Sequence, residues 1–365
     1  MKPVLKLIKV EKNDITAALT AFFRKLLEEK LAGAVLVPQR TEGSVIMTLV
    51  KNPERVTCVD PVSPVMISNS ATIVSELTST PVVEKIAVLL RPCEARALVE
   101  LVKLKQASAE QLIVFGIDCH GAFKVTDFAD FAGEGRTDTA AAFLDMVKEG
   151  KEDERLRAGC SLCVRPEPTA VDIALRLFGE KLENGITAEA RTEKGKELLE
   201  KMNLPDGSES EEREKVLGEI LKKRKEALEA IDISDFPSLI SNCIRCYNCR
   251  AVCPICYCKE CLFDDSSKLG YDPARYLSLA GKKGALRMPV DTLLFHLTRL
   301  NHMVSSCVAC GMCEAACPTD IPLAKIYASI GDEVGKLLDY EPGRSLEEEI
   351  PLATFKENEL ETVAD

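Results

Sequence analysis

The sequence predicts an α/β domain followed by a smaller helical domain, in a chain of 365 residues. Two buried apolar runs, residues 85–90 and 111–117, enclose a segment with helical periodicity. This strand–helix–strand order is typical of a βαβ unit with parallel strands. In the second half, one cysteine spacing occurs twice, in residues 243–253 and 307–317. The length allows two or three domains with a real core.

The composition excludes several classes of protein. The formal net charge is −11, which argues against nucleic acid or an anionic membrane as the main partner. The N-terminus has no apolar run followed by a cleavage site, and no stretch approaches the ~20 apolar residues of a membrane helix. We therefore expect a cytoplasmic protein. Thiols stay reduced there, so the sixteen cysteines are expected to be metal ligands rather than disulfides.

The repeated spacing is C-x2-C-x2-C-x3-C followed by proline, the bacterial-ferredoxin pattern for [4Fe-4S] clusters. In that pattern three close thiolates bind one cluster and the fourth reaches the other. The first expected ligand set is Cys243, Cys246, Cys249 and Cys317. The second is Cys307, Cys310, Cys313 and Cys253. A pair of zinc ribbons is the alternative, but it does not explain the third and fourth cysteines and the proline, all occurring twice.

The residues between the two motifs predict helices, so the cluster domain is expected to be helical with ligand loops at helix ends. The apolar residues expected to line one face of the second helix are Leu293, Leu294, Leu297, Leu300 and Val304. His296 and His302 lie on the same segment. They are either groups that tune a cluster or ordinary partly buried or surface histidines.

Cys256, Cys258 and Cys261 follow the first motif and have no obvious fourth partner. Three interpretations stay open. They bind an extra cluster with a distant ligand such as Cys58, they replace a ligand in the sets above, or they are buried without a metal.

The first half of the chain carries a second group of cysteines. Cys93 and Cys119 each follow a predicted strand, and ligands gather at the carboxyl ends of strands in open α/β sheets. The pair Cys160 and Cys163 would complete four thiolates, enough for a third [4Fe-4S] cluster. The alternative is that these cysteines are small buried hydrophobic residues.

Several segments resemble the beta subunit of coenzyme F420-linked hydrogenases and formate dehydrogenases. The segments "RPCEARAL", "GIDCHGAF" and "CSLCVRPEPTAVDIALRLFG" match that family in type and order. "KNDITAALTAFFRKLLEEKLAGAVLVP" resembles its segment near the flavin, although Asn13 and Asp14 stand where the family usually has two glycines. "SCVACGMCEAACP" resembles the formate dehydrogenase branch. The resemblance covers about residues 10–180 and 236–325.

The resemblance implies an FAD beside the cluster of Cys93, Cys119, Cys160 and Cys163. The chain has no G-x-G-x-x-G, so the flavin would not sit in a standard dinucleotide-binding turn. Polar groups at two predicted helix starts are the expected flavin contacts, because a helix start suits phosphate. They are Asn13, Asp14, Thr16, Asn69, Ser70 and Thr72.

The expected domains are a flavin and iron–sulfur domain (1–180), a charged helical connector (181–235), a helical two-cluster domain (236–330) and an acidic tail (331–365). Together they predict an oxidoreductase subunit that converts between hydride and single electrons. The expected partners are a catalytic formate dehydrogenase or hydrogenase subunit and a soluble carrier, namely F420, NAD or ferredoxin. The alternative is a flavin-free wiring subunit that links two redox partners, one of them a heterodisulfide reductase-type flavoprotein.

Overall fold

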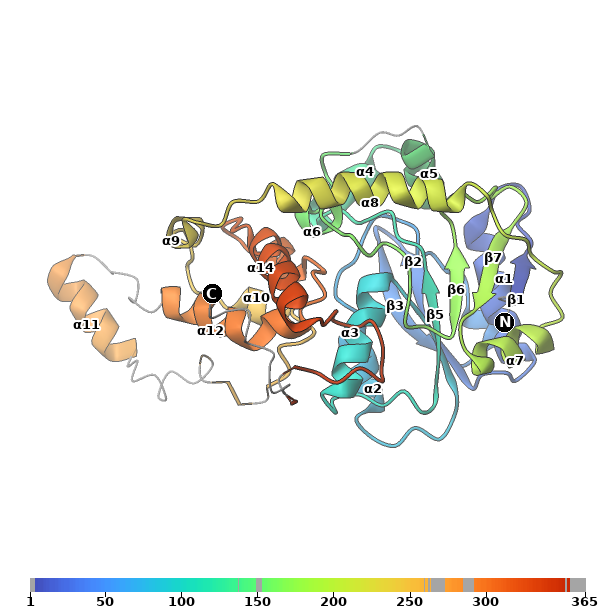
Figure 1. The fold of residues 1–365 in the computed structure, drawn as a ribbon, viewed down its shortest axis with the longest axis horizontal. Coiled ribbons are helices and arrows are strands. Elements are labelled where there is room, and N and C mark those ends of the chain that lie inside the picture. Colours follow the sequence, from blue (N-terminus) through green and yellow to red (C-terminus); the bar gives the residue numbers. More distant parts are fainter. Residues whose placement is uncertain are drawn as a thin grey trace.

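The computed structural model describes residues 4–136, 138–148, 153–258, 260–261, 263, 273–284, 292–351 and 353–354. Figure 1 shows two parts side by side: a sheet with its helices, and a group of helices that contains the repeated cysteine motifs. The predicted α/β domain followed by a helical cluster domain is confirmed. Among the described residues, no helix is both long enough and apolar enough to span a membrane.

The sheet has seven strands in the order β1-β7-β6-β5-β4-β2-β3. In chain order they are β1 (Val4–Ile8), β2 (Ala34–Thr41), β3 (Ser44–Val50), β4 (Ile86–Leu90), β5 (Leu112–Ile117), β6 (Ile173–Arg176) and β7 (Ile186–Ala190). Strands β2, β4, β5 and β6 are mutually parallel, whereas β3 and β7 pair antiparallel with their neighbours. The predicted βαβ unit is β4–α3–β5, with α3 spanning Pro92–Lys103.

The carboxyl ends of five strands share one edge of the sheet. β1 is antiparallel to β7, and β7 is antiparallel to β6, so β1 runs in the same direction as the parallel strands. The starts of α1 (Ile15–Glu28) and α3, as well as Cys119 after β5, therefore gather at this edge. Such an edge is where open α/β sheets bind ligands.

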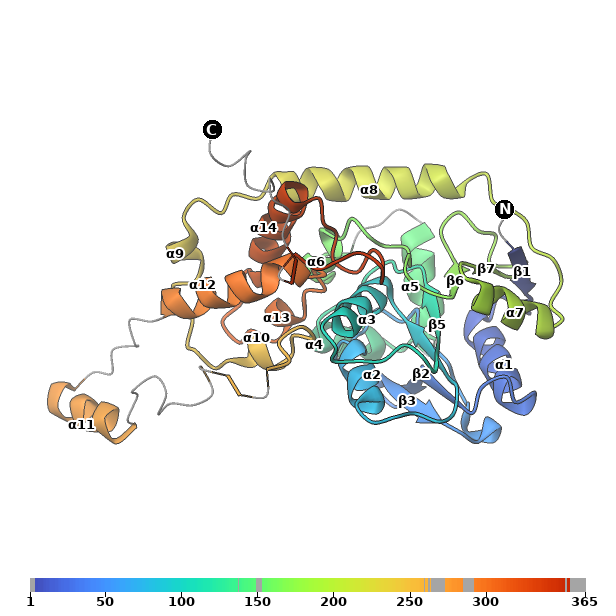
Figure 2. The same cartoon turned by 60° about the horizontal axis from the view of Figure 1, so that its bottom comes forward.

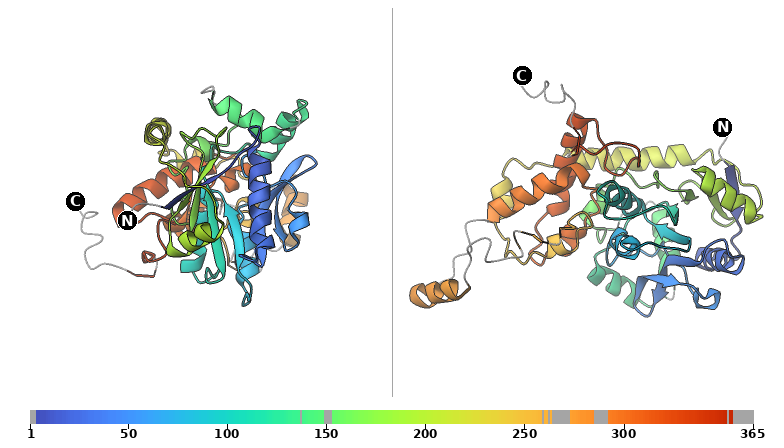
Figure 3. Two further views of the ribbon diagram at one scale, coloured as in Figure 1. Left: turned by 90° about the vertical axis from the view of Figure 1, so that its right-hand side faces the viewer. Right: turned by 90° about the horizontal axis from the view of Figure 1, so that it is seen from below.

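Both faces of the sheet are buried, and successive residues of β4 alternate between two cores. Ala87 and Leu89 pack with α1 and α7 (Glu193–Lys201), whereas Val88 and Leu90 pack with α2 (Ala71–Thr78) and α3. The second core continues into the cluster domain. That domain therefore lies against the α2–α3 side of the sheet, as Figure 3 shows from two further directions.

The remaining helices of the first part are α4 (Val125–Gly133), α5 (Thr139–Lys148), α6 (Ala158–Ser161) and α8 (Arg213–Glu229). The cluster domain contains α9 (Phe236–Leu239), α10 (Asn248–Ala251), α11 (Pro273–Lys283), α12 (Thr292–Met303), α13 (Met312–Ala315) and α14 (Leu323–Leu338). Single 3-10 turns occur at Pro53–Arg55 and Val304–Ser306. Helix α8 extends along both parts (Figure 2).

Two of the expected segment boundaries differ from the structure. The segment 181–235 begins with β7 and α7, which belong to the sheet domain, so only its later part connects the two domains. The segment 331–365 begins inside α14, and Tyr340 is buried against the sheet domain, where its hydroxyl donates to Glu100 at 2.6 Å. Residues 352 and 355–365 of the expected acidic tail lie outside the described residues.

The expected apolar face of α12 is also wrong. Leu293, Leu294 and Leu297 are 40%, 58% and 45% exposed. The helix buries its opposite side, which carries Phe295, His296, Arg299 and Met303. The polar residues His296 and Arg299 face inward because this side of α12 packs against the cysteine motifs.

Candidate functional site

The two ferredoxin-type motifs adopt the same local backbone. Arg245 and Tyr247 of the first motif have φ of 56° and 61°, and Ala309 and Gly311 at the matching positions have φ of 53° and 72°. Left-handed backbone at non-glycine residues is uncommon and clusters at functional sites. Each motif continues into a single helical turn, α10 or α13, and these two turns pack against each other.

The first predicted ligand set surrounds one cavity. Its lining includes Cys243, Cys246, Cys249 and Cys317, so the fourth cysteine of the second motif does reach the first motif. Burial raises the pKa of Cys249, and the three neighbouring thiols raise it further. Four thiolates crowded into apolar surroundings would be costly without a cation, and the four sulfur donors match those of a [4Fe-4S] cluster.

The second set is arranged in the reciprocal way. Burial raises the pKa of Cys313, and Cys310 and Cys307 raise it further. Cys256 and burial raise the pKa of Cys253 in the first motif, and Cys310 of the second motif adds a smaller rise, so Cys253 lies near Cys310. Cys317 thus lies beside the first motif and Cys253 lies near the second, which is the placement that the bacterial-ferredoxin pattern predicts.

Helix α12 presents two polar side chains to these cysteines. His296 is 2% exposed and lines the cavity of the first set, and neither ring nitrogen has a partner among the described residues. Arg299 is 3% exposed, donates to the carbonyl of Cys249 at 3.2 Å and lies near Cys253. Its guanidinium adds positive charge between the two ligand sets, which favours thiolate and cluster charge there.

The third predicted set lies at the carboxyl edge of the sheet. Cys93 begins α3, Cys119 follows β5, and Cys160 and Cys163 flank the end of α6. Burial raises the pKa of Cys93 well above its usual value, and Cys119 and Cys163 contribute to the rise. Burial also raises the pKa of Cys119, partly offset by the guanidinium of Arg91. The four thiols therefore form one interacting group, whose donors fit a [4Fe-4S] cluster.

Sequence reasoning missed Arg91. The residue is 7% exposed, and its Nη2 donates to the carbonyl of Ser63 at 2.8 Å, whereas its Nη1 has no partner among the described residues. The pKa of Arg91 is raised overall although burial opposes this, because Cys119, Glu94 and Cys93 lie close to it. The only sequence signal was its place beside Cys93 at the end of a predicted strand.

The third set lies directly against the second. Cys163 and Cys307 line the same cavity, of about 230 Å³. Helix α6 meets the second motif through two glycines, and a Cβ added to Gly159 would lie 2.8 Å from the Cα of Gly311. Cys310 also packs with Cys93 around Met312. Close backbone approach at the two glycines thus brings the ligand sets together.

Three of the six expected flavin contacts line one of two cavities at this edge. Asp14 and Thr16 line one of about 360 Å³, at the start of α1, and Ser70 lines another of about 110 Å³ beside Arg91. Asn13, Asn69 and Thr72 line neither of these two cavities.

Several of these groups already have local partners. Asp14 accepts from the amide of Ala17 at 2.8 Å as the cap of α1. Ser70 donates to Glu94 at 2.6 Å, and Thr72 donates to the carbonyl of Asn69 at 2.8 Å. These three residues therefore hold the starts of α1 and α2 in addition to any role toward a ligand.

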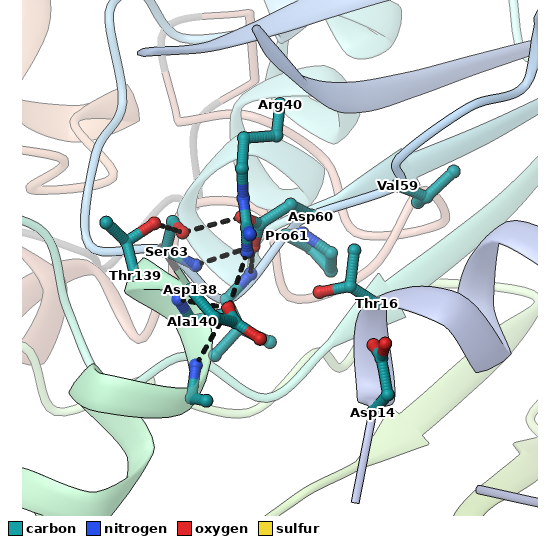
Figure 4. A network of polar contacts seen from close by, with 12 residues as sticks. Asp14, Thr16, Arg40, Val59, Asp60, Pro61, Ser63, Asp138, Thr139 and Ala140 are labelled. Atoms are coloured by element: carbon teal, nitrogen blue, oxygen red, sulfur yellow. Dashed lines mark hydrogen bonds and ion pairs between the residues drawn. The ribbon is translucent and has the colours of Figure 1, made fainter. Parts of the chain in front are cut away.

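A partly buried polar network borders the larger cavity (Figure 4). Arg40, at the end of β2, donates to Asp60 at 2.7 Å and to Asp138 at 2.8 Å. Asp60 is fully buried and also accepts from the amide and the hydroxyl of Ser63, and that hydroxyl lies 2.6 Å from the hydroxyl of Thr139. The network fixes a cation at the carboxyl edge, opposite the start of α1.

Cys256, Cys258 and Cys261 belong to none of the three sets and line a separate cavity. Cys256 accepts a hydrogen bond from Cys253, which lowers its pKa to about 6. Cys58 lines the cavity at α1 instead, so within the described part of the chain it does not share their cavity.

Comparisons with known proteins agree with this arrangement. Residues 239–321 match the 4Fe-4S dicluster domain, and residues 83–215 match the family described as the C terminus of the coenzyme F420 hydrogenase/dehydrogenase beta subunit. The F420-dependent formate dehydrogenase subunit beta of Methanocaldococcus jannaschii is 29% identical over 92% of this chain and 93% of the relative. The beta subunit of F420-dependent formate dehydrogenase 1 from Methanococcus maripaludis is 28% identical over 94% of each chain.

One solved structure is also similar. A chain from the xenon-derivatised F420-reducing [NiFe] hydrogenase complex of Methanosarcina barkeri has a TM-score of 0.48 and 14% identity, covering 63% of this chain and 91% of that chain.

The fold and the cysteine sets define an iron–sulfur electron-transfer protein with a dicluster domain joined to an α/β domain. Within that class, the chain is similar to the beta subunits of F420-dependent formate dehydrogenases, and its residues 83–215 match the coenzyme F420 hydrogenase/dehydrogenase beta subunit family.

Proposed function

We propose that the chain is the electron-transfer subunit of an F420-linked formate dehydrogenase or hydrogenase complex. The observation that carries this proposal is the order of the three cysteine sets. The Cys243 set adjoins the Cys307 set, which adjoins the Cys93 set at the ligand-binding edge of the sheet. The names of the two relatives support formate as the source of electrons.

The donor sets fit the proposed cofactors. The three cysteine sets would hold [4Fe-4S] clusters, which are one-electron carriers, and an FAD would exchange both single electrons and hydride. The cavity beside Arg91 adjoins the Cys93 set through Met66, which lines that cavity and packs with Cys93 and Cys160. This cavity therefore suits the redox-active ring of a flavin.

The neighbouring cavity at α1 suits the phosphates of the same flavin. It joins the start of a fourteen-residue helix to the cations Arg24 and Arg40. A helix N-terminus attracts anions through its unpaired amides and its dipole. The chain's own residues thus offer an apolar cavity beside the third cluster set and a cationic cavity at α1, which would take the flavin ring and the pyrophosphate of FAD, respectively.

The experiment supplies electrons from a dye, so that no partner subunit is needed. Full-length protein, purified without oxygen and saturated with FAD, would receive electrons from a reduced viologen dye, with F420 or NAD as the acceptor. We expect reduction of F420, followed by its absorbance, to be faster than reduction of NAD. Flavin-loaded protein that reduces neither carrier would refute hydride exchange by this chain.

A flavin-free wiring subunit is the second candidate, because Arg40 is already neutralised by Asp60 and Asp138. This candidate predicts that the anaerobic protein contains iron and sulfide but neither contains nor takes up flavin. Acid release of flavin after incubation with FAD separates the two candidates.

A further inference from the structure

Cys256, Cys258 and Cys261 line a cavity of about 390 Å³ in the described part of the chain. The side chain of His302, from the last turn of α12, lines the same cavity. Three thiols from one short loop therefore face an imidazole that lies more than forty residues away in the sequence.

The surroundings suit a group with negative charge. Arg250 and Arg299 line the cavity together with the apolar side chains of Leu104, Phe263 and Met303. Cations near thiolates favour the deprotonated, ligating form, and an apolar shell limits solvent access to a metal site. Cys256 also lies close to Cys253, a member of the second ligand set, so the two sites are neighbours.

The spacing favours a cluster over a single ion. In the described part of the chain, no three His, Cys, Asp or Glu side chains are arranged to hold one metal ion. A zinc ion needs four donors that converge on a point. Among the described residues, the cysteines of the dicluster domain are not arranged to hold one ion either, as expected of ligands that a cubane would separate. The cavity of Cys256 and His302 therefore resembles the cluster sites.

We propose that Cys256, Cys258, Cys261 and His302 hold an additional [4Fe-4S] cluster. The site lies next to the second ferredoxin-type set, because Cys256 is close to Cys253. Cys258 and His302 are exposed, so this cluster lies at the surface and serves as a second port for one-electron exchange. The proposal goes beyond the function above, which requires only the three other sets.

The test counts metals in full-length protein purified without oxygen. The wild type is expected to contain about sixteen irons and the double variant Cys258→Ser/Cys261→Ser about twelve, because one cubane holds four irons. Acid-labile sulfide should fall in parallel. Reduction of F420 by viologen dye in the double variant shows separately whether the three other sets and the flavin remain intact.

The role of His302 as a ligand is tested by the spectroscopic signal of a nitrogen bound to the cluster. Pulsed electron paramagnetic resonance of the reduced wild type should show a nitrogen bound directly to one cluster. His302→Cys should keep the iron but lose that nitrogen signal, because thiolate replaces imidazole. About one zinc per chain at this site, or equal iron in the wild type and the double variant, would overturn the proposal. Unchanged nitrogen coupling in His302→Cys would exclude His302 as the ligand.

Discussion

Replacing His296 by leucine should lower the midpoint potential of the first ferredoxin-type cluster. Burial, with a smaller contribution from Arg299, lowers the pKa of His296 to about 4, so its ring is neutral at pH 7 and carries one N–H donor. The ring is 2% exposed, and both nitrogens lack partners among the described residues. An unsatisfied buried donor costs about 1–3 kcal/mol, so we expect the N–H to point at a sulfur atom of the cluster.

The size of the shift follows from the charge of the cluster. Reduction adds one negative charge, which strengthens a hydrogen bond donated to the cluster. A difference of about 1 kcal/mol between the two redox states corresponds to about 40 mV, since 59 mV is tenfold for one electron. His296→Leu removes the donor and should lower the potential by about that amount.

A redox titration followed by electron paramagnetic resonance measures this potential in the full-length protein. His296→Gln is the matched control, because its amide keeps a donor and should retain most of the wild-type potential. Equal potentials in the wild type and His296→Leu, with all iron retained, would refute the hydrogen bond. So would equal shifts in the leucine and glutamine variants.

Three further changes test other parts of the account. Ala17→Asp places a carboxylate at the cavity wall near α1, so flavin per chain should fall severalfold while iron stays constant. Gly159→Val forces α6 away from Gly311, so flavin reduction by viologen dye should slow at least tenfold in stopped-flow experiments. Arg213→Met leaves the buried carboxylate of Asp118 without its ion pair, so the protein should lose about 3–5 kcal/mol of stability and unfold at a lower temperature in a thermal scan.

Each of these variants has a control. Ala17→Asn has nearly the same size as the aspartate variant and should keep its flavin. Gly133→Ala replaces a helical glycine with open space around it and should leave flavin reduction unchanged. Lys215→Met removes an exposed cation from the same helix as Arg213 and should unfold at the wild-type temperature. A control that behaves like its test variant would contradict the corresponding argument.

Local patterns predicted much of the fold. The apolar runs before Cys93 and Cys119 predicted the strand–helix–strand unit, because the periodicity of a strand or a helix depends only on residues that are close in the sequence. The spacing predicted that Cys317 lies beside the first motif, and the cavity around Cys317 agrees with this placement, whereas the ligand role of Cys253 stays a prediction. The start of α1 was expected from the family resemblance of its segment, and Asp14 caps it in the structure.

Other features depend on contacts between distant segments. Arg40, Asp60 and Asp138 form one network although they are far apart in the chain, so no local pattern shows it. The inward face of α12 was predicted wrongly, because helical periodicity assumes an apolar core. This helix instead packs against thiols, and it turns His296 and Arg299 inward.

The central claim is that three cysteine sets hold clusters that lead to a flavin. Its most direct test is the joint quantification of iron, acid-labile sulfide and acid-released flavin in wild-type protein purified without oxygen. The account predicts at least about twelve irons with matching sulfide and about one FAD per chain, and about sixteen irons with the additional cluster. About eight irons without flavin would contradict the claim, since the dicluster domain alone would then carry metal.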